Sequence, residues 1–134
     1  MAERRGARVL IVDDDPGVRQ FLIALLTRDG ISSAVAEDGQ AAIEILGRER
    51  FDVILLDMLM PRVDGLGVLR YMRDQAIDTP VVVVSAVSDQ MAELIDPTLV
   101  RVALQKPFDP RGLRDVVAAV IAETDQAVAA SGRE

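Results

Sequence analysis

The sequence has no cysteine and no histidine among its 134 residues. Without cysteine, the chain cannot form disulfides or thiolate metal sites. Without histidine, it has no imidazole ligand, no Ser-His-Asp catalysis and no phosphohistidine of its own. The chemistry open to it therefore rests on carboxylates, hydroxyls, an amine and the backbone.

An excess of positive charge and long apolar runs are also missing. Lys plus Arg number 15 against 22 Asp plus Glu, which gives a net charge of −7. An acidic surface disfavours direct binding to nucleic acid or to anionic membranes. No apolar run approaches the ~20 residues that span a bilayer, and residues 1–8 lack the apolar segment of a signal peptide. We therefore expect a cytoplasmic protein with no direct nucleic-acid or membrane partner.

Short apolar runs alternate with helical patterns along the chain. Three runs rich in β-branched residues are typical of strands buried on both faces of a parallel sheet, and two weaker candidates follow the same order. The expected strands are Val9–Val12, Ser33–Ala36, Val53–Leu56, Val81–Val84 and Val100–Leu104. Helical spacing predicts helices around residues 18–26, 42–46, 66–72 and 113–121, and a less regular one over 88–95. This alternation favours an α/β fold with helices on both faces of the sheet.

The length fits one domain that can bury its own core. We expect this domain over residues 8–125, between an N-terminal extension (1–7) and a flexible C-terminal tail (126–134) of small and polar residues. Asp38 is placed to cap the second predicted helix. Asp109 and Pro110 are placed as the cap and first residue of the last one.

Polar side chains stand where four of the predicted strands end. The acidic run Asp13–Asp15 follows the first strand, Asp57 the third, Ser85 the fourth and Lys106 the fifth. Each of them has an ordinary structural explanation when taken alone: a helix cap, a turn, a satisfied hydroxyl or a solvated charge. Ligands of open α/β sheets, however, bind outside the carboxyl ends of the strands. Together these residues therefore predict a site at one edge of the sheet.

The chemistry of this predicted site suits a divalent cation. Two carboxylates ~4 Å apart repel each other by about 4 kcal/mol at an effective dielectric constant near 20. A hard cation removes that penalty, and Mg²⁺ accepts carboxylates, a carbonyl, waters and a phosphoryl oxygen; Mn²⁺ can replace it. A carboxylate can also act as a nucleophile and form an aspartyl phosphate, with the metal and Lys106 neutralising the transferred group.

Four ordered motifs, VLIVDDDP, LLDMLMPRVDG, VVVVSA and KPF, identify a family resemblance. From about Arg8 to Thr124 the chain resembles the receiver domain of bacterial response regulators in two-component systems, chemotaxis receivers among them. The resemblance implies a flavodoxin-like (βα)5 doubly wound parallel sheet with strand order 2-1-3-4-5. It also implies a signalling switch rather than an enzyme, which catalyses only its own phosphorylation and slow dephosphorylation. The phosphate would come from a sensor histidine kinase or a histidine phosphotransfer protein.

The resemblance assigns roles to the matching residues. Asp57 matches the phospho-acceptor, Ser85 the switch hydroxyl, and Lys106 the lysine that contacts the phosphoryl group. The Lys106–Pro107 peptide bond is expected to be cis, which proline makes affordable. Asp14 would bind Mg²⁺ directly and Asp13 largely through water. The implied metal ligands are Asp13, Asp14, Asp57 and the backbone carbonyl of Leu59.

Three places depart from the commonest pattern of the family. Ala103 stands where the family usually has an aromatic residue, and Asp96-Pro97-Thr98-Leu99 replaces the usual Gly-Ala segment. Both changes touch the face formed by the helix over 88–95, the strand over 100–104 and the last helix, where a downstream protein or linked output domain would read the state. Leu59 and Val87, which would flank the phosphoryl group, are both apolar.

Two alternative functions remain open at this point. A degenerate receiver could act as a constitutive interaction module; the loss of the aromatic at Ala103 favours it, and the complete set of site residues opposes it. A haloacid-dehalogenase-like phosphatase could use Asp13 and Asp15. That enzyme would need a further acidic pair after a later strand, and it leaves Asp57 unexplained.

Overall fold

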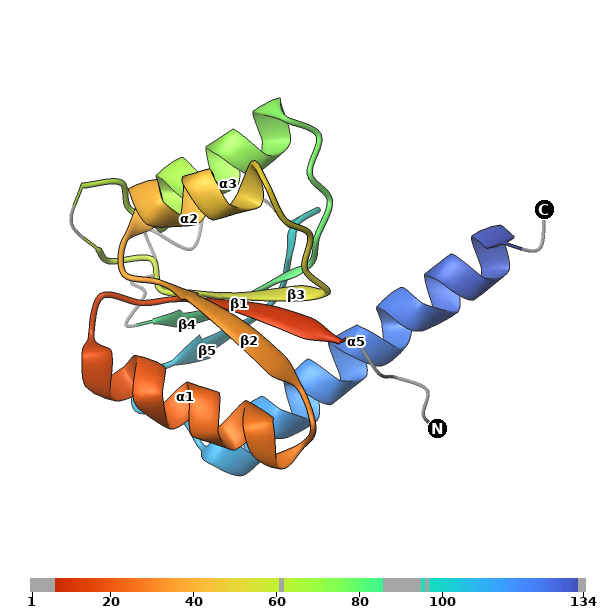
Figure 1. Ribbon diagram of the computed structural model, residues 1–134, viewed down its shortest axis with the longest axis horizontal. Coiled ribbons are helices and arrows are strands. Elements are labelled where there is room, and N and C mark those ends of the chain that lie inside the picture. The colour runs from red at the N-terminus through yellow and green to blue at the C-terminus, as the bar shows by residue number, and fades with distance from the viewer. Residues whose placement is uncertain (1–6, 61, 86–94, 96, 133–134) are drawn as a thin grey trace.

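The apolar runs form a five-stranded parallel sheet in the order β2-β1-β3-β4-β5 (Figure 1). Its strands are β1 (Arg8–Val12), β2 (Ser32–Ala36), β3 (Val53–Leu56), β4 (Val81–Ser85) and β5 (Val100–Gln105). The computed structural model describes residues 7–60, 62–85, 95 and 97–132, with side chains up to residue 123. The α/β fold and the strand order 2-1-3-4-5 are thereby confirmed.

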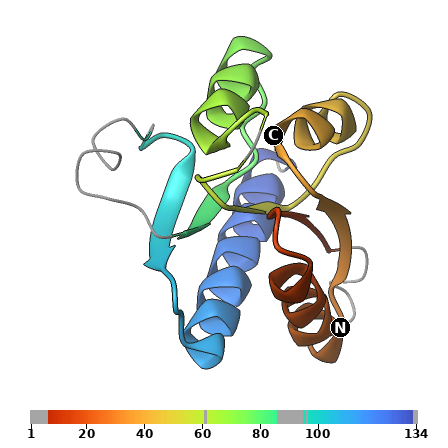
Figure 2. The same ribbon diagram turned by 90° about the vertical axis from the view of Figure 1, so that its left-hand side faces the viewer.

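Helices cover both faces of the sheet, as Figure 1 and Figure 2 show. On one face lie α1 (Pro16–Arg28) and α5 (Pro110–Gly132), and on the other lie α2 (Gly39–Leu46) and α3 (Gly65–Asp74). The helix expected over 88–95 lies outside the described residues except for Ile95, and so does the loop with Val87.

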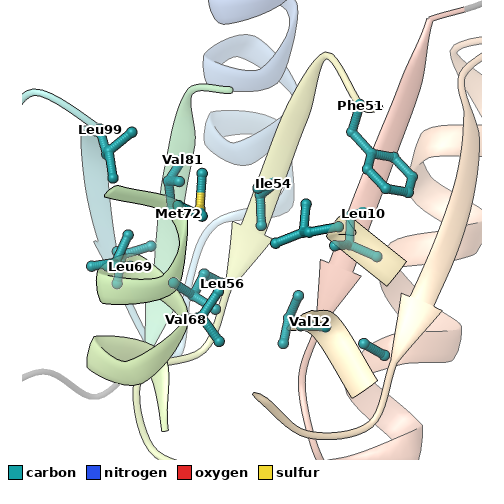
Figure 3. Packing of buried hydrophobic residues seen from close by; sticks show 14 of the residues in the cluster. Leu10, Val12, Phe51, Ile54, Leu56, Val68, Leu69, Met72, Val81 and Leu99 are labelled. Atoms are coloured by element: carbon teal, nitrogen blue, oxygen red, sulfur yellow. The ribbon is translucent and has the colours of Figure 1, made fainter. Parts of the chain in front are cut away.

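The sheet is buried on both faces because successive side chains of a strand point in opposite directions. Leu10 and Ile54 are register partners across β1 and β3, and both pack under α2 and α3 in the cluster of Figure 3. Their strand neighbours Ile11 and Leu55 pack under α1 and α5. This two-sided burial explains why the strands read as unbroken apolar runs.

The predicted helix caps are present. The side chain of Asp38 accepts a hydrogen bond from the backbone N–H of Ala41 at 2.8 Å. The side chain of Asp109 accepts one from the backbone N–H of Arg111 at 3.1 Å, before the helix that begins at Pro110. Both contacts satisfy N–H groups that have no partner within the helix.

The helix α5 continues to Gly132 and projects beyond the sheet (Figure 1), and the flexibility expected of the tail from residue 126 stays a prediction. The small residues there include Ala127, Ala129 and Ala130, and alanine has the highest intrinsic helix propensity. No proline follows Pro110 to end the helix earlier. The limits of the domain at 8 and 125 stay a prediction. Among the described residues, no helix is long and apolar enough to span a membrane.

Candidate functional site

Three carboxylates meet at the carboxyl edge of the central strands. Asp13 and Asp14 follow β1, and Asp57 follows the adjacent strand β3. One oxygen of each lies within 4.8 Å of the others. Asp13 and Asp57 are buried, whereas Asp14 is exposed. The site is therefore open to solvent on the side of Asp14, while the carboxylates of Asp13 and Asp57 are held inside the protein. A cation could enter from the open side.

Asp57 is held by contacts to both of its carboxylate oxygens. The hydroxyl of Ser85 donates a hydrogen bond to Oδ1 at 2.8 Å, and the backbone N–H of Leu59 donates to the same oxygen at 3.0 Å. The ammonium of Lys106 lies 3.5 Å from Oδ2. The structure therefore brings together the hydroxyl, the lysine and the carboxylate that the sequence placed on three separate strand ends.

Lys106 is shared between two acids. Its Nζ lies 2.9 Å from Oδ2 of Asp13, closer than to Asp57. Burial would lower the pKa of Lys106, but the hydrogen bond and charge of Asp13, with the charge of Asp57, outweigh burial and raise that pKa. For Asp13 the effect of burial is the reverse: burial raises the pKa of this carboxyl and outweighs the hydrogen bonds from the Asp15 backbone and Lys106, which lower it. The cis Lys106–Pro107 bond is confirmed.

Lys106 is also the only lysine of the chain, because every other basic side chain is an arginine. This asymmetry was available from the sequence and was a signal that sequence reasoning did not use. Arginine is the usual choice for buried and interface ion pairs, whereas lysine supplies a compact point charge on a flexible stem. The single exception to arginine therefore stands in the site.

The third acid of the run has a different role. The side chain of Asp15 caps α1, accepting hydrogen bonds from the backbone N–H groups of Gly17 at 2.8 Å and Val18 at 3.4 Å. This contact engages the carboxylate that the phosphatase alternative needs as its second acid. The structural explanation of Asp15 as a cap is thus sufficient.

Arg19 is a site neighbour that the sequence reasoning missed. From the first turn of α1, it donates a hydrogen bond from Nη1 to the backbone carbonyl of Asp13 at 2.9 Å. The backbone N–H of Asp13 donates to the carbonyl of Ala36 at 3.2 Å. The backbone N–H and the backbone carbonyl of Asp13 are therefore both held by hydrogen bonds. The spacing of six residues along the chain carries no motif that would have foretold this contact.

The loop after Asp57 lines the rim of the site. The side chain of Leu59 is 50% exposed there. Gly65 closes the loop, since a Cβ at this position would lie 2.7 Å from Cα of Met58. A glycine is therefore required by the close approach of the backbone. Pro61, the other residue expected to shape this loop, lies outside the described residues.

The donor set fits the predicted cation. Three converging carboxylates supply hard oxygen ligands, which Mg²⁺ and Mn²⁺ prefer. Their mutual repulsion is relieved only in part by Lys106, whose side chain is 26% exposed. The doubly wound sheet with this acidic pocket at the carboxyl ends of its central strands is the arrangement that the receiver resemblance implies.

Comparison with known proteins agrees with this class. The response regulator receiver domain family matches residues 9–118, so the chain belongs to that family. It is 43% identical over 90 residues to the response regulator MprA of Mycobacterium leprae, covering 65% of this chain and 40% of that protein. With MprA of Mycolicibacterium vanbaalenii the identity is 41% over 90 residues, which cover 65% of this chain and 39% of that protein. The chain thus spans less than half the length of these relatives.

Solved receiver structures show the same architecture. The receiver domain of the Francisella response regulator 1452 superimposes with a TM-score of 0.81 at 32% identity, over 89% of this chain and 99% of that one. The response regulator TrrA of Thermotoga maritima, solved in complex with Mg²⁺ and BeF, gives a TM-score of 0.76 at 26% identity, over 85% of this chain and 98% of that one.

Proposed function

We propose that this chain is the phospho-acceptor receiver of a cytoplasmic two-component phosphorelay, with Mg²⁺-dependent phosphorylation at Asp57. The observation that supports it most is the position of Asp57 itself. One of its oxygens accepts the hydrogen bond of Ser85, the other faces Lys106, and the acidic pair lies beside it. The Asp57 carboxylate, which would act as the nucleophile, therefore lies beside a lysine that can neutralise charge and a hydroxyl that can change its hydrogen-bond partner.

The transfer places a carboxylate oxygen of Asp57 on the phosphorus as the bond to a partner's histidine nitrogen breaks. Since the chain has no histidine, the donor is another molecule: a sensor histidine kinase or a histidine phosphotransfer protein. When bound, Mg²⁺ would neutralise charge on the phosphoryl oxygens. Asp13, Asp14, Asp57 and the backbone carbonyl of Leu59 would hold it, and Lys106 would pair with the phosphoryl group.

The donor must reach Asp57 across the surface beside it. Next to Lys106 lies an apolar groove of about 610 Å³ between α1 and the start of α5, with Val18, Phe21 and Phe108 in its lining. Phe21 is 44% exposed. We assign this groove to the phosphohistidine-bearing partner, because a partner seated there would lie beside the acceptor. Apolar surface next to a charged site also suits a transient protein contact.

The switch would run through Ser85. Its hydroxyl now donates to Asp57, and it would turn to a phosphoryl oxygen after transfer. Charge-assisted hydrogen bonds contribute about 1.5–3 kcal/mol each, and moving a two-state element from 1:99 to 99:1 takes about 5.5 kcal/mol. Bonds from Ser85 and Lys106 would supply much of that difference. A downstream protein or linked output domain would read it on the face of β5, α5 and the helix expected over 88–95; Ala103 of β5 is exposed.

Phosphoramidate with Mg²⁺ tests the function directly. We expect the intact mass to increase by one phosphate, and the Asp57→Asn variant to remain unmodified. Phosphate on Ser85 or Asp15 would refute the assignment. Sustained release of phosphate in many turnovers would favour the phosphatase alternative, and no labelling at all would favour the constitutive interaction module.

A further inference from the structure

The loop between β3 and α3, of which the structure describes residues 58–60 and 62–64, is fixed to the acceptor at its start. The backbone N–H of Leu59 donates to Oδ1 of Asp57 at 3.0 Å. The backbone N–H of Gly65 donates to the carbonyl of Met58 at 3.1 Å and closes the base of the loop. Any displacement of the loop therefore acts on the residues nearest Asp57.

At its far side the same loop is tied to the first turn of α2. Nη2 of Arg62 lies 2.9 Å from Oδ2 of Asp38, whose side chain is only 10% exposed. Asp38 is fixed in turn, because its Oδ1 caps α2 through the N–H of Ala41. The backbone of Arg62 has φ of 67°, a left-handed conformation that arginine rarely adopts. The ion pair thus joins a firmly held carboxylate to an unusual loop conformation.

A steric contact between the loop and α2 accompanies the ion pair. A Cβ at Gly39 would lie 2.0 Å from the backbone carbonyl oxygen of Val63, and one at Gly67 would lie 2.5 Å from Cγ1 of Val63. Val63 is therefore seated between a glycine of α2 and a glycine of α3. The loop can occupy this position only while both glycines leave the space free.

We propose that the Arg62–Asp38 ion pair and the Gly39–Val63 contact form a tether that sets the position of the loop and, through it, the affinity of the site for Mg²⁺. Arg62 is then a positioning residue that acts through Leu59. The inference rests on the proposed function, because the carbonyl of Leu59 serves there as a metal ligand. Neither Arg62 nor Gly39 belongs to the acidic site itself.

The first test measures the Mg²⁺ dissociation constant of the full, unphosphorylated chain from the dependence of the melting temperature on Mg²⁺. We expect Arg62→Gln to weaken Mg²⁺ binding by about 3- to 10-fold. Loss of a nearby positive charge alone would have the opposite sign and tighten binding. Arg62→Lys, which keeps the charge, should restore part of the affinity. Arg70→Gln, an exposed arginine of α3, is the matched control and should bind Mg²⁺ as the native chain does.

A double-mutant cycle separates the tether from a general structural role. Asp38→Asn keeps an oxygen to cap α2 but removes the charge, and Arg62→Gln should have no further effect on Mg²⁺ affinity in that background. A purely structural role would lower the melting temperature equally with and without Mg²⁺ and leave the dissociation constant unchanged. That result would overturn the inference.

Gly39→Ala tests the same tether without changing any charge. The added Cβ must push the carbonyl of Val63 away, so we expect weaker Mg²⁺ binding here as well. Gly112→Ala is the control, since its Cβ would meet only an ordinary contact at 3.7 Å. Native Mg²⁺ affinity in Gly39→Ala or in Arg62→Gln overturns the tether. Absence of any Mg²⁺ response in the native chain would instead refute the proposed function.

Discussion

Lys106 is paired first with Asp13, at 2.9 Å between Nζ and Oδ2, and only then with Asp57, at 3.5 Å. In the unphosphorylated protein the lysine therefore stands beside a carboxylate that the proposed metal would use. Mg²⁺ and Lys106 then compete for the same negative charge. Binding of the metal would release the lysine toward Asp57, where the phosphoryl group arrives.

This competition predicts opposite effects of Lys106→Gln on two measurements. A positive charge ~6 Å from a divalent ion opposes its binding by about 5.5 kcal/mol at an effective dielectric constant near 20. Solvent screening of the partly exposed lysine reduces this term, so we expect Mg²⁺ to bind roughly tenfold more tightly. Phosphorylation by phosphoramidate should become slower, because the charge that faces the phosphoryl group is lost. Weaker Mg²⁺ binding in this variant would contradict the competition.

Removal of Asp14 should abolish stabilisation by the metal. Mg²⁺ at 100 times its dissociation constant is expected to stabilise the native chain by about 2.7 kcal/mol. Asp14 is exposed, so Asp14→Ala should leave the metal-free melting temperature close to native while removing the increase with Mg²⁺. Asp74→Ala, an exposed acid of α3, is the control. An unchanged Mg²⁺ response in Asp14→Ala would place the metal elsewhere.

Ser85→Ala should separate phosphorylation from switching. The acceptor, the acidic pair and Lys106 are intact in this variant, so we expect phosphorylation within a few-fold of native. Beryllofluoride should protect backbone amides of residues 86–95 and β5 from hydrogen exchange in the native chain, and this protection should be lost without the hydroxyl. Equal protection in the two proteins would show that the switch does not run through Ser85.

Leu59 should prolong the life of the phosphorylated state. Loss of phosphate needs a water molecule in line with the bond to Asp57 and benefits from a polar group that orients it. The Leu59 side chain at the rim of the site cannot hydrogen-bond that water. We expect slow self-dephosphorylation of the native chain, and decay about 10-fold faster in Leu59→Asn, a barrier lower by about 1.4 kcal/mol. Decay within seconds in the native chain would be inconsistent with this role.

The Asp29–Arg114 pair predicts a pH dependence away from the site. Asp29 ends α1, where a carboxylate is unfavourable, and Arg114 of α5 binds it through two contacts of 2.6 and 3.0 Å. The hydrogen bond from Arg114 lowers the pKa of Asp29 below its ordinary value near 3.8. A lowered pKa adds stability above that ordinary value, and this stability is lost as pH falls through the folded pKa.

Carboxyl resonances followed by NMR through an acid titration check this prediction. In Arg114→Gln, the pKa of Asp29 should rise toward its ordinary value of 3.8, because the hydrogen bond that causes most of the lowering is lost. The loss of stability in this variant should be largest at neutral pH and shrink in acid. Arg111→Gln, in the same helix, should leave the Asp29 titration as it is. An Asp29 pKa that is unchanged by Arg114→Gln would exclude the pair as its cause.

The central strands and the site were predictable because one physical constraint governs both. A strand buried on two faces must be apolar throughout, so Val53–Leu56 can be predicted as a strand without any knowledge of its neighbours. The carboxyl ends of parallel strands share one edge, so the residues that end those runs must meet. Asp57, Ser85 and Lys106 could therefore be brought together from their places in the sequence alone.

Contacts between loops and between helices were not predictable in the same way. Arg114 and Asp29 are 85 residues apart, and nothing in their local sequences marks them as partners. Arg62 reaches Asp38 only because Gly39 lets the β3–α3 loop approach α2, which is a property of packing. The length of α5 was hard to predict for a different reason: its last residues are small and polar and show no apolar stripe, although alanine favours helix.

Because the chain has a single lysine, a chemical label can be placed at one side chain of the proposed switch. Reductive methylation with isotope-labelled formaldehyde modifies amines only and preserves their positive charge, so besides an α-amino group it would label Lys106 alone. The resulting methyl resonance would come from a group that lies between Asp13 and Asp57. It should shift when Mg²⁺ enters and again when Asp57 is phosphorylated. Occupancy of the site could then be followed in a mixture with kinase and output partners from one signal, with no other resonance of the chain assigned.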